Sequence, residues 1–141
     1  MIKNIVLLSL FILSFRSYAV DSPREIYEDY EKNQKLGMTF NKIYSYYSKS
    51  NKKRNEEILS TYASQMKMTR EEVIEFFLPS LKVEAKCEET KFVTQEIDGS
   101  IALLEYELTN ICEELSEGEG KLLIRLINEN GWKIDKMDSY D

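Results

Sequence analysis

Two cysteines on either side of a tight turn restrict the fold of this chain more than any other feature. Residues 98–100 read Asp-Gly-Ser, a strong turn signal, and a two-residue turn there makes Asp98 face Ile101. The same register places Cys87 directly opposite Cys112. We therefore predict a hairpin held by a Cys87–Cys112 disulfide, with the cysteines in a closely spaced, non-hydrogen-bonded pair.

Alternation of apolar and charged residues extends this hairpin into a four-stranded antiparallel meander. The alternation begins at Leu81 and has the period of a half-buried strand. The predicted register also places Val93 beside Tyr106, although a bulge at Glu88–Lys91 would change it. The expected strands cover residues 81–97, 101–113, 121–128 and 132–138, with an acidic loop at 114–120 and a turn at Asn130-Gly131.

The segment before these strands has helical spacing and clear helix-start signals. Capping residues are expected at Ser22, Thr39 and Thr69. The expected helices run from Pro23 to about Gly37, from Thr39 past Tyr47, from about Asn55 to Lys67, and from Thr69 to a stop at Pro79, with a polar, basic connection at Lys49–Asn55.

The N-terminal segment Met1–Ala19 has the pattern of a secretory signal peptide. Lys3 precedes a short apolar run, and small residues at the end predict cleavage before Val20. The run is too short to span a bilayer, so we expect no stable membrane anchor. The sequence thus predicts a single domain over residues 20–141 in the periplasm or outside the cell, where two cysteines usually pair.

Helices followed by a meander predict an α+β fold, with N-terminal helices packed on a curved four-stranded antiparallel sheet. With this order of elements and the final-strand sequence Asn-Gly-Trp-Lys-Ile-Asp at Asn130–Asp135, the mature chain resembles small exported bacterial members of the nuclear transport factor 2-like superfamily. That superfamily has a cystatin-like cone with a pocket between helices and sheet, and its members include isomerases, dehydratases and binding modules. The residues expected to line such a pocket are Tyr30, Tyr44, Tyr106, Trp132 and Ile134.

Catalytic and metal-binding signals are weak in this sequence. The chain has no histidine, the commonest general base and transition-metal ligand, and no nucleophile or phosphate-binding motif. Carboxylates that could act with a tyrosine are Glu105, Glu107 and Asp135, but the simpler interpretation is core tyrosines and solvated strand faces. We therefore predict no catalytic residues, no metal and no cofactor.

Charge indicates the class of partner. The first 19 residues contain two basic residues and no acid, so the remainder holds 17 basic and 25 acidic residues, a net charge of −8. That balance argues against nucleic acid. The prediction is a non-catalytic exported binding module for a small apolar ligand or a protein partner, including immunity or inhibitor proteins. The alternative is a small histidine-free, metal-free isomerase or dehydratase-like enzyme; the oligomeric state stays open.

Overall fold

Among the described residues, four helices come first and four strands follow, which confirms the predicted α+β fold class. The computed structural model describes residues 21–112 and 119–140, so the predicted signal peptide, its cleavage site and most of the acidic loop lie outside the described residues. The helices are α1 (Pro23–Leu36), α2 (Phe40–Tyr46), α3 (Lys49–Met66) and α4 (Arg70–Cys87). The strands are β1 (Glu88–Asp98), β2 (Ile101–Asn110), β3 (Glu119–Asn128) and β4 (Trp132–Tyr140).

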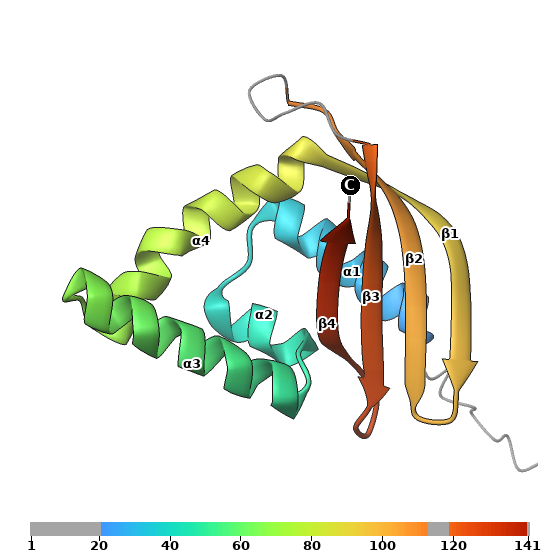
Figure 1. Cartoon of the computed structure of the whole chain (residues 1–141), viewed down its shortest axis with the longest axis horizontal. Coiled ribbons are helices and arrows are strands. Elements are labelled where there is room, and N and C mark those ends of the chain that lie inside the picture. Colours follow the sequence, from blue (N-terminus) through green and yellow to red (C-terminus); the bar gives the residue numbers. More distant parts are fainter. Residues whose placement is uncertain (1–20, 113–118, 141) are drawn as a thin grey trace, which may run out of the picture.

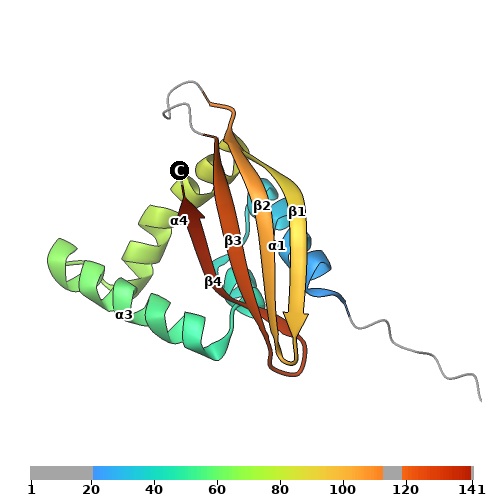
Figure 2. The ribbon, with the colours of Figure 1, turned by 45° about the vertical axis from the view of Figure 1, so that its right-hand side comes forward.

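The strands form one antiparallel sheet in the order β1-β2-β3-β4. In Figure 1 the sheet is curved, α1 crosses one of its faces, and α3 and α4 project as a pair beside β4. The turned view in Figure 2 shows the same separation, with the α3–α4 pair standing away from the sheet. Within the described ranges, no helix is long and apolar enough to cross a membrane.

The core lies between the sheet and the first two helices. Its buried members from the helices are aromatic or branched, and those from β2, β3 and β4 alternate along each strand, as expected for a sheet covered on one face. They are Tyr27, Tyr30, Ile43, Tyr46, Ala102, Leu104, Tyr106, Ile124, Leu126, Trp132 and Ile134.

A polar side chain caps the N-terminus of each of these helices. Ser22 and Thr69 form the expected capping boxes, and Thr39 caps α2 through the backbone amide of Lys42. Ser48 caps α3 in the same way, which sequence reasoning missed. The polar connection predicted at Lys49–Asn55 is therefore wrong: these residues form the first turns of α3, because nothing in their composition opposes a helix once a cap precedes them.

The stop predicted at Pro79 and the strand predicted from Leu81 to Cys87 are also wrong. Pro79 lies inside α4, which continues to Cys87. The alternating pattern was ambiguous because Leu81 and Ala85 are two strand repeats apart and also one helical turn apart. In the structure these two residues are half-buried on one face of α4, while Val83 between them is exposed.

The turn after β1 confirms the predicted register near the hairpin, with Asp98 opposite Ile101. Beyond Thr94 a bulge at Val93 shifts the pairing by one residue, so Phe92 faces Tyr106. The predicted Val93–Tyr106 pair is therefore wrong. The shift brings the Phe92 ring, rather than the valine, against the core.

Candidate functional site

The five residues expected to line one pocket lie in different parts of the structure. Tyr106, Trp132 and Ile134 are buried in the core, where Tyr106 and Ile134 are almost completely inaccessible. Tyr30 is buried in the same cluster and also borders a small pocket beneath α4. Tyr44 lies apart on α2, where its hydroxyl donates a 2.8 Å hydrogen bond to Glu56. Side chains thus fill the middle of the space between helices and sheet.

Tyrosine rings make up most of that filling. Tyr27 packs on Tyr106 with 5.0 Å between ring centroids, and Tyr30 meets Tyr46 edge to face at 5.4 Å. Burial raises the pKa of Tyr30 and Tyr106, and burial with a hydrogen bond to Asp29 raises the pKa of Tyr46 to about 12. These phenols stay protonated at neutral pH and are poor general bases.

The carboxylates considered for acid–base chemistry form hydrogen bonds or ion pairs with side chains other than tyrosines. Asp135 is 3% exposed and accepts hydrogen bonds from Ser48 at 2.7 Å and Arg125 at 2.6 Å. Glu105 and Glu107 form ion pairs of 3.0 Å with lysines of neighbouring strands. Among the described residues, no hydrogen bond joins one of these three carboxylates to a tyrosine.

The Cys87–Cys112 disulfide is confirmed, with 5.1 Å between the two Cα atoms. Its setting differs from the prediction because Cys87 is the last residue of α4 and Cys112 follows β2. The bulge at Val93 shifts the register by one residue, and the backbone amide of Ile111, the residue before Cys112, donates a 2.8 Å hydrogen bond to the Cys87 carbonyl. The bond therefore ties the end of α4 to the end of β2.

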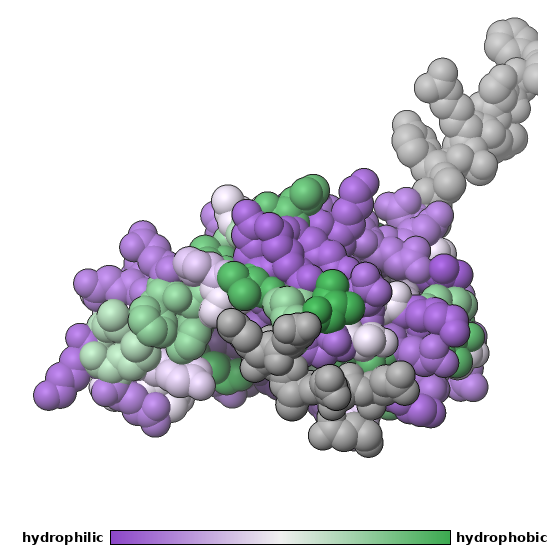
Figure 3. Space-filling model, turned by 90° about the horizontal axis from the view of Figure 1, so that it is seen from above, coloured by the Kyte–Doolittle hydropathy of each residue, from purple (hydrophilic) through white to green (hydrophobic). Residues whose placement is uncertain are grey.

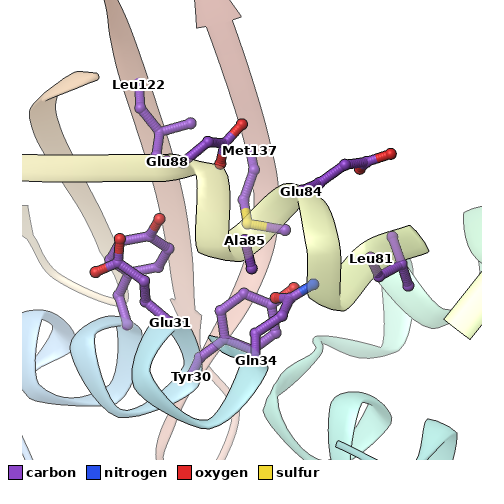
Figure 4. A pocket seen from close by; sticks show the side chains of 10 residues that line it. Tyr30, Glu31, Gln34, Leu81, Glu84, Ala85, Glu88, Leu122 and Met137 are labelled. Atoms are coloured by element: carbon purple, nitrogen blue, oxygen red, sulfur yellow. The ribbon is translucent and has the colours of Figure 1, made fainter. Parts of the chain in front are cut away.

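A small pocket lies between α1, the end of α4 and the sheet, with a volume of about 150 Å³. Figure 4 shows Glu31 rising from α1 and Glu88 on the opposite side, where α4 passes into β1. The lining residues are Tyr27, Tyr30, Glu31, Gln34, Leu81, Glu84, Ala85, Glu88, Leu122 and Met137.

A larger and more apolar groove of about 280 Å³ separates α3 from α4. Ile58 and Tyr62 of α3 are 51% and 41% exposed there, and the Tyr62 ring lies 5.1 Å from that of Phe77. The groove is lined by Phe40, Asn55, Ile58, Leu59, Tyr62, Ile74, Phe77, Leu78 and Leu81. Figure 3 shows apolar side chains at the surface of this end of the molecule.

Sequence reasoning placed Ile58, Leu59 and Tyr62 on one helical face but did not identify this groove. Helical spacing marks an apolar face without saying whether another element covers it. Most of the α4 residues in the groove, Ile74, Phe77 and Leu78, precede Pro79 and fall within the helix that was predicted. The part of α4 beyond Pro79 runs toward α1 and the sheet.

Comparisons with protein-family models, with curated proteins and with solved structures found no match to this chain. The relation to the nuclear transport factor 2-like superfamily therefore stays a prediction. Any function assigned to the chain must be argued from its own surfaces.

Proposed function

We propose that this chain is an exported, non-catalytic binding protein that takes an amphipathic helix of a basic protein partner in the groove between α3 and α4. The observation that carries the proposal is the apolar lining of this groove, which is left open at Ile58 and Tyr62. Contiguous apolar surface on a folded domain is typical of interaction sites.

The shape of the groove favours a helix as its occupant. Ile58 and Tyr62 are one helical turn apart on α3, and Ile74, Leu78 and Leu81 follow a similar spacing on α4. Two such rows form a channel into which a third helix can insert side chains at matching intervals. Covering Ile58 and Tyr62 would stabilise the complex by about 1 kcal/mol each, since both are only half-exposed at the start.

Charge favours a basic partner. The chain after the predicted cleavage site has a net charge of −8, and acidic proteins associate faster with basic ones. Proteins of the immunity or inhibitor type are one class with this property. Among the basic residues at the start of α3, Arg54 lies 3.7 Å from the Asp135 carboxylate, which offsets its charge.

The other functions considered have less support. A small apolar ligand in the centre of the cone would compete with Tyr106 and Trp132, which occupy that space. The carboxylates considered for an isomerase or dehydratase-like enzyme, Glu105, Glu107 and Asp135, are each paired with a basic side chain. Export is supported by the Cys87–Cys112 disulfide, since such bonds persist in oxidising compartments.

The test uses two variants with matched exposure. Ile58→Asp places a charge in the groove, and Leu103→Asp places the same charge on the outer face of the sheet, where Leu103 is 49% exposed. The purified protein and both variants are used to capture proteins from the native export compartment, and each captured protein is purified and titrated back by calorimetry.

We expect a partner that binds the unaltered protein and Leu103→Asp with one-to-one stoichiometry and fails to bind Ile58→Asp. A partner that tolerates Ile58→Asp would contradict the proposal. So would a groove-dependent self-association in sedimentation analysis, because the occupant would then be a second copy of this chain.

A further inference from the structure

The turn between β3 and β4 contains an Asn-Gly pair, and its backbone conformation explains why. Asn128 pairs with Trp132, so residues 129–131 make the turn. Asn130 has a φ of 58° and Gly131 a φ of 118°, both of which are positive. Asparagine tolerates the left-handed conformation better than most residues, and glycine adopts positive φ without steric cost. The turn therefore favours asparagine at the first of these positions and glycine at the second.

The same pair is chemically labile. In an Asn-Gly pair the glycine nitrogen can attack the side-chain carbonyl carbon of asparagine, because no glycine side chain hinders the approach. Asn130 is the only asparagine in the sequence that glycine follows. Its side chain is exposed, and among the described residues only chain neighbours lie within 4 Å of where a Cβ on Gly131 would stand. Water and base can therefore reach the reacting atoms.

The carboxamide of Asn130 is also free to move. Within the described ranges it forms no hydrogen bond, whereas most other asparagine side chains there do. Asn41, which is exposed on α2, shares this freedom, but lysine follows it. The asparagines whose side chains are engaged are Asn33, Asn51, Asn55, Asn110 and Asn128. A free carboxamide and a following glycine thus coincide at Asn130.

A neighbouring side chain holds the attacking nitrogen. The backbone N–H of Gly131 donates a 3.1 Å hydrogen bond to Oδ1 of Asn128. The Gly131 carbonyl accepts a 2.9 Å bond from the Glu129 amide, which fixes the turn further. For the attack, the Gly131 nitrogen must lose its proton and the backbone of Asn130 must rotate, so the bond to Asn128 has to open first. In the folded protein, Asn128 therefore slows the reaction.

We propose that Asn130 is a site of spontaneous deamidation and that Asn128 sets its rate in the folded protein. The Gly131 nitrogen loses its proton and bonds to Cγ of Asn130, the bond from Cγ to the amide nitrogen breaks, and ammonia leaves with that proton. Water then opens the succinimide ring at either carbonyl and gives aspartate or isoaspartate. Water is consumed and ammonia released in equal amounts, and nothing is oxidised or reduced.

The modification would affect the start of α3 through Glu129. Oε2 of Glu129 accepts a 3.2 Å hydrogen bond from the backbone amide of Lys49, the first residue of α3. Deamidation places a new carboxylate beside Glu129, and isoaspartate also lengthens the backbone of the turn. Charge repulsion and the longer turn both draw Glu129 away from Lys49. The site is separate from the α3–α4 groove and does not depend on what the groove binds.

The test is a time course on the purified protein at mildly alkaline pH, with peptide mass spectrometry that separates aspartate from isoaspartate. We expect the peptide containing Asn130 to gain the mass difference between an amide and an acid, with isoaspartate as the main product. The peptide containing Asn41 is the internal control and should not change over the same period. An unchanged Asn130, or equal conversion of Asn41, would overturn the proposal.

Two variants test the role of Asn128. Asn128→Ala removes the acceptor and should raise the rate at Asn130 about three- to tenfold, the factor that corresponds to one neutral hydrogen bond. Asn110→Ala removes a comparable acceptor, which holds the Cys112 amide, and should leave the rate unchanged. In denaturant, the unaltered chain and Asn128→Ala should react equally fast, because the hydrogen bond no longer exists.

Equal rates in the folded unaltered protein and Asn128→Ala would overturn the role of Asn128. An equal acceleration in Asn110→Ala, or a difference that persists in denaturant, would overturn it as well. NMR spectra of the aged protein test the effect on α3. The amide signal of Lys49 should move and that of Gly37, at the end of α1, should not. A fixed Lys49 signal in fully modified protein would contradict the effect on α3.

Discussion

The hydroxyl of Ser48 donates a 2.7 Å hydrogen bond to the buried carboxylate of Asp135, 87 positions further along the chain. The same Ser48 oxygen accepts a 2.9 Å bond from the backbone amide of Asn51, so it caps α3 as well. One side chain therefore starts a helix and fixes that helix to β4.

Removing this hydroxyl should destabilise the protein. Ser48→Ala loses the cap and leaves one Asp135 oxygen with fewer donors, so we expect the free energy of unfolding to fall by about 2–4 kcal/mol. Denaturant unfolding measures it. Ser60→Ala, at an exposed position within α3, is the control and should change stability by less than about 0.5 kcal/mol. Equal effects in the two variants would show that the bond contributes nothing.

Replacing Trp132 by alanine should also lower the free energy of unfolding. Trp132 is 9% exposed on the helix-covered face, and Trp132→Ala should lower the free energy of unfolding by about 3–5 kcal/mol. The same measurement on Leu103→Ala, which removes a half-exposed side chain from the opposite face, should give a much smaller change. A value near zero for Trp132→Ala would contradict its place in the core.

Reducing the disulfide should lower the melting temperature without unfolding the protein at room temperature. The two cysteines are 25 positions apart, and closing a loop of that length stabilises by about 3 kcal/mol in the chain-entropy model. Thermal melts with and without reductant measure the effect, and the Cys87→Ala/Cys112→Ala double variant should match the reduced protein and ignore the reductant. Two reactive thiols in the unreduced, unfolded protein would rule out the bond.

Glu88 should make stability depend on pH. Its pKa is raised above the ordinary 4.5 by burial and by Glu84 and Glu31, with Lys35 opposing. The folded state therefore binds the Glu88 proton more tightly than the unfolded state does, so protonation of Glu88 stabilises the fold. This stabilisation is lost as the pH rises through the pKa of Glu88 in the folded state. Glu88→Gln should stabilise the protein at neutral pH, and the gain should vanish well below pH 4.5. Denaturant unfolding curves at neutral pH and well below pH 4.5, with Glu75→Gln as the control, show whether the unfolding free energy changes in this direction.

How far the sequence predicts this structure depends on which interactions are local. The capping boxes at Ser22 and Thr69 and the turn after Asp98 involve residues within a few positions of one another, and they were predicted correctly. The disulfide was predicted because only two cysteines were available to pair. The length of α4 was not, since Leu81 and Ala85 fit both strand and helix spacing.

The candidate sites were less predictable because they depend on how distant elements meet. The small pocket beneath α4 brings Tyr27 on α1 close to Glu88 at the start of β1, and no local pattern relates the two residues. The same is true of Ser48 and Asp135: the bulge that turns Asp135 toward α3 becomes visible only when β3 and β4 are paired. Tyrosines expected around a pocket instead fill the core, because spacing does not reveal how much volume the opposing sheet leaves.

The bulge in β4 also affects how this protein meets other copies of itself at high concentration. β4 is an edge strand, and an edge that continues straight offers unpaired backbone groups on which sheets from neighbouring molecules can grow. Here Tyr47 forms a bridge to Ile134, the Ser48 amide bonds the Ile134 carbonyl at 2.9 Å, and Asp135 interrupts the pairing directly afterwards. The residue that anchors α3 thus also protects the sheet against edge-to-edge aggregation.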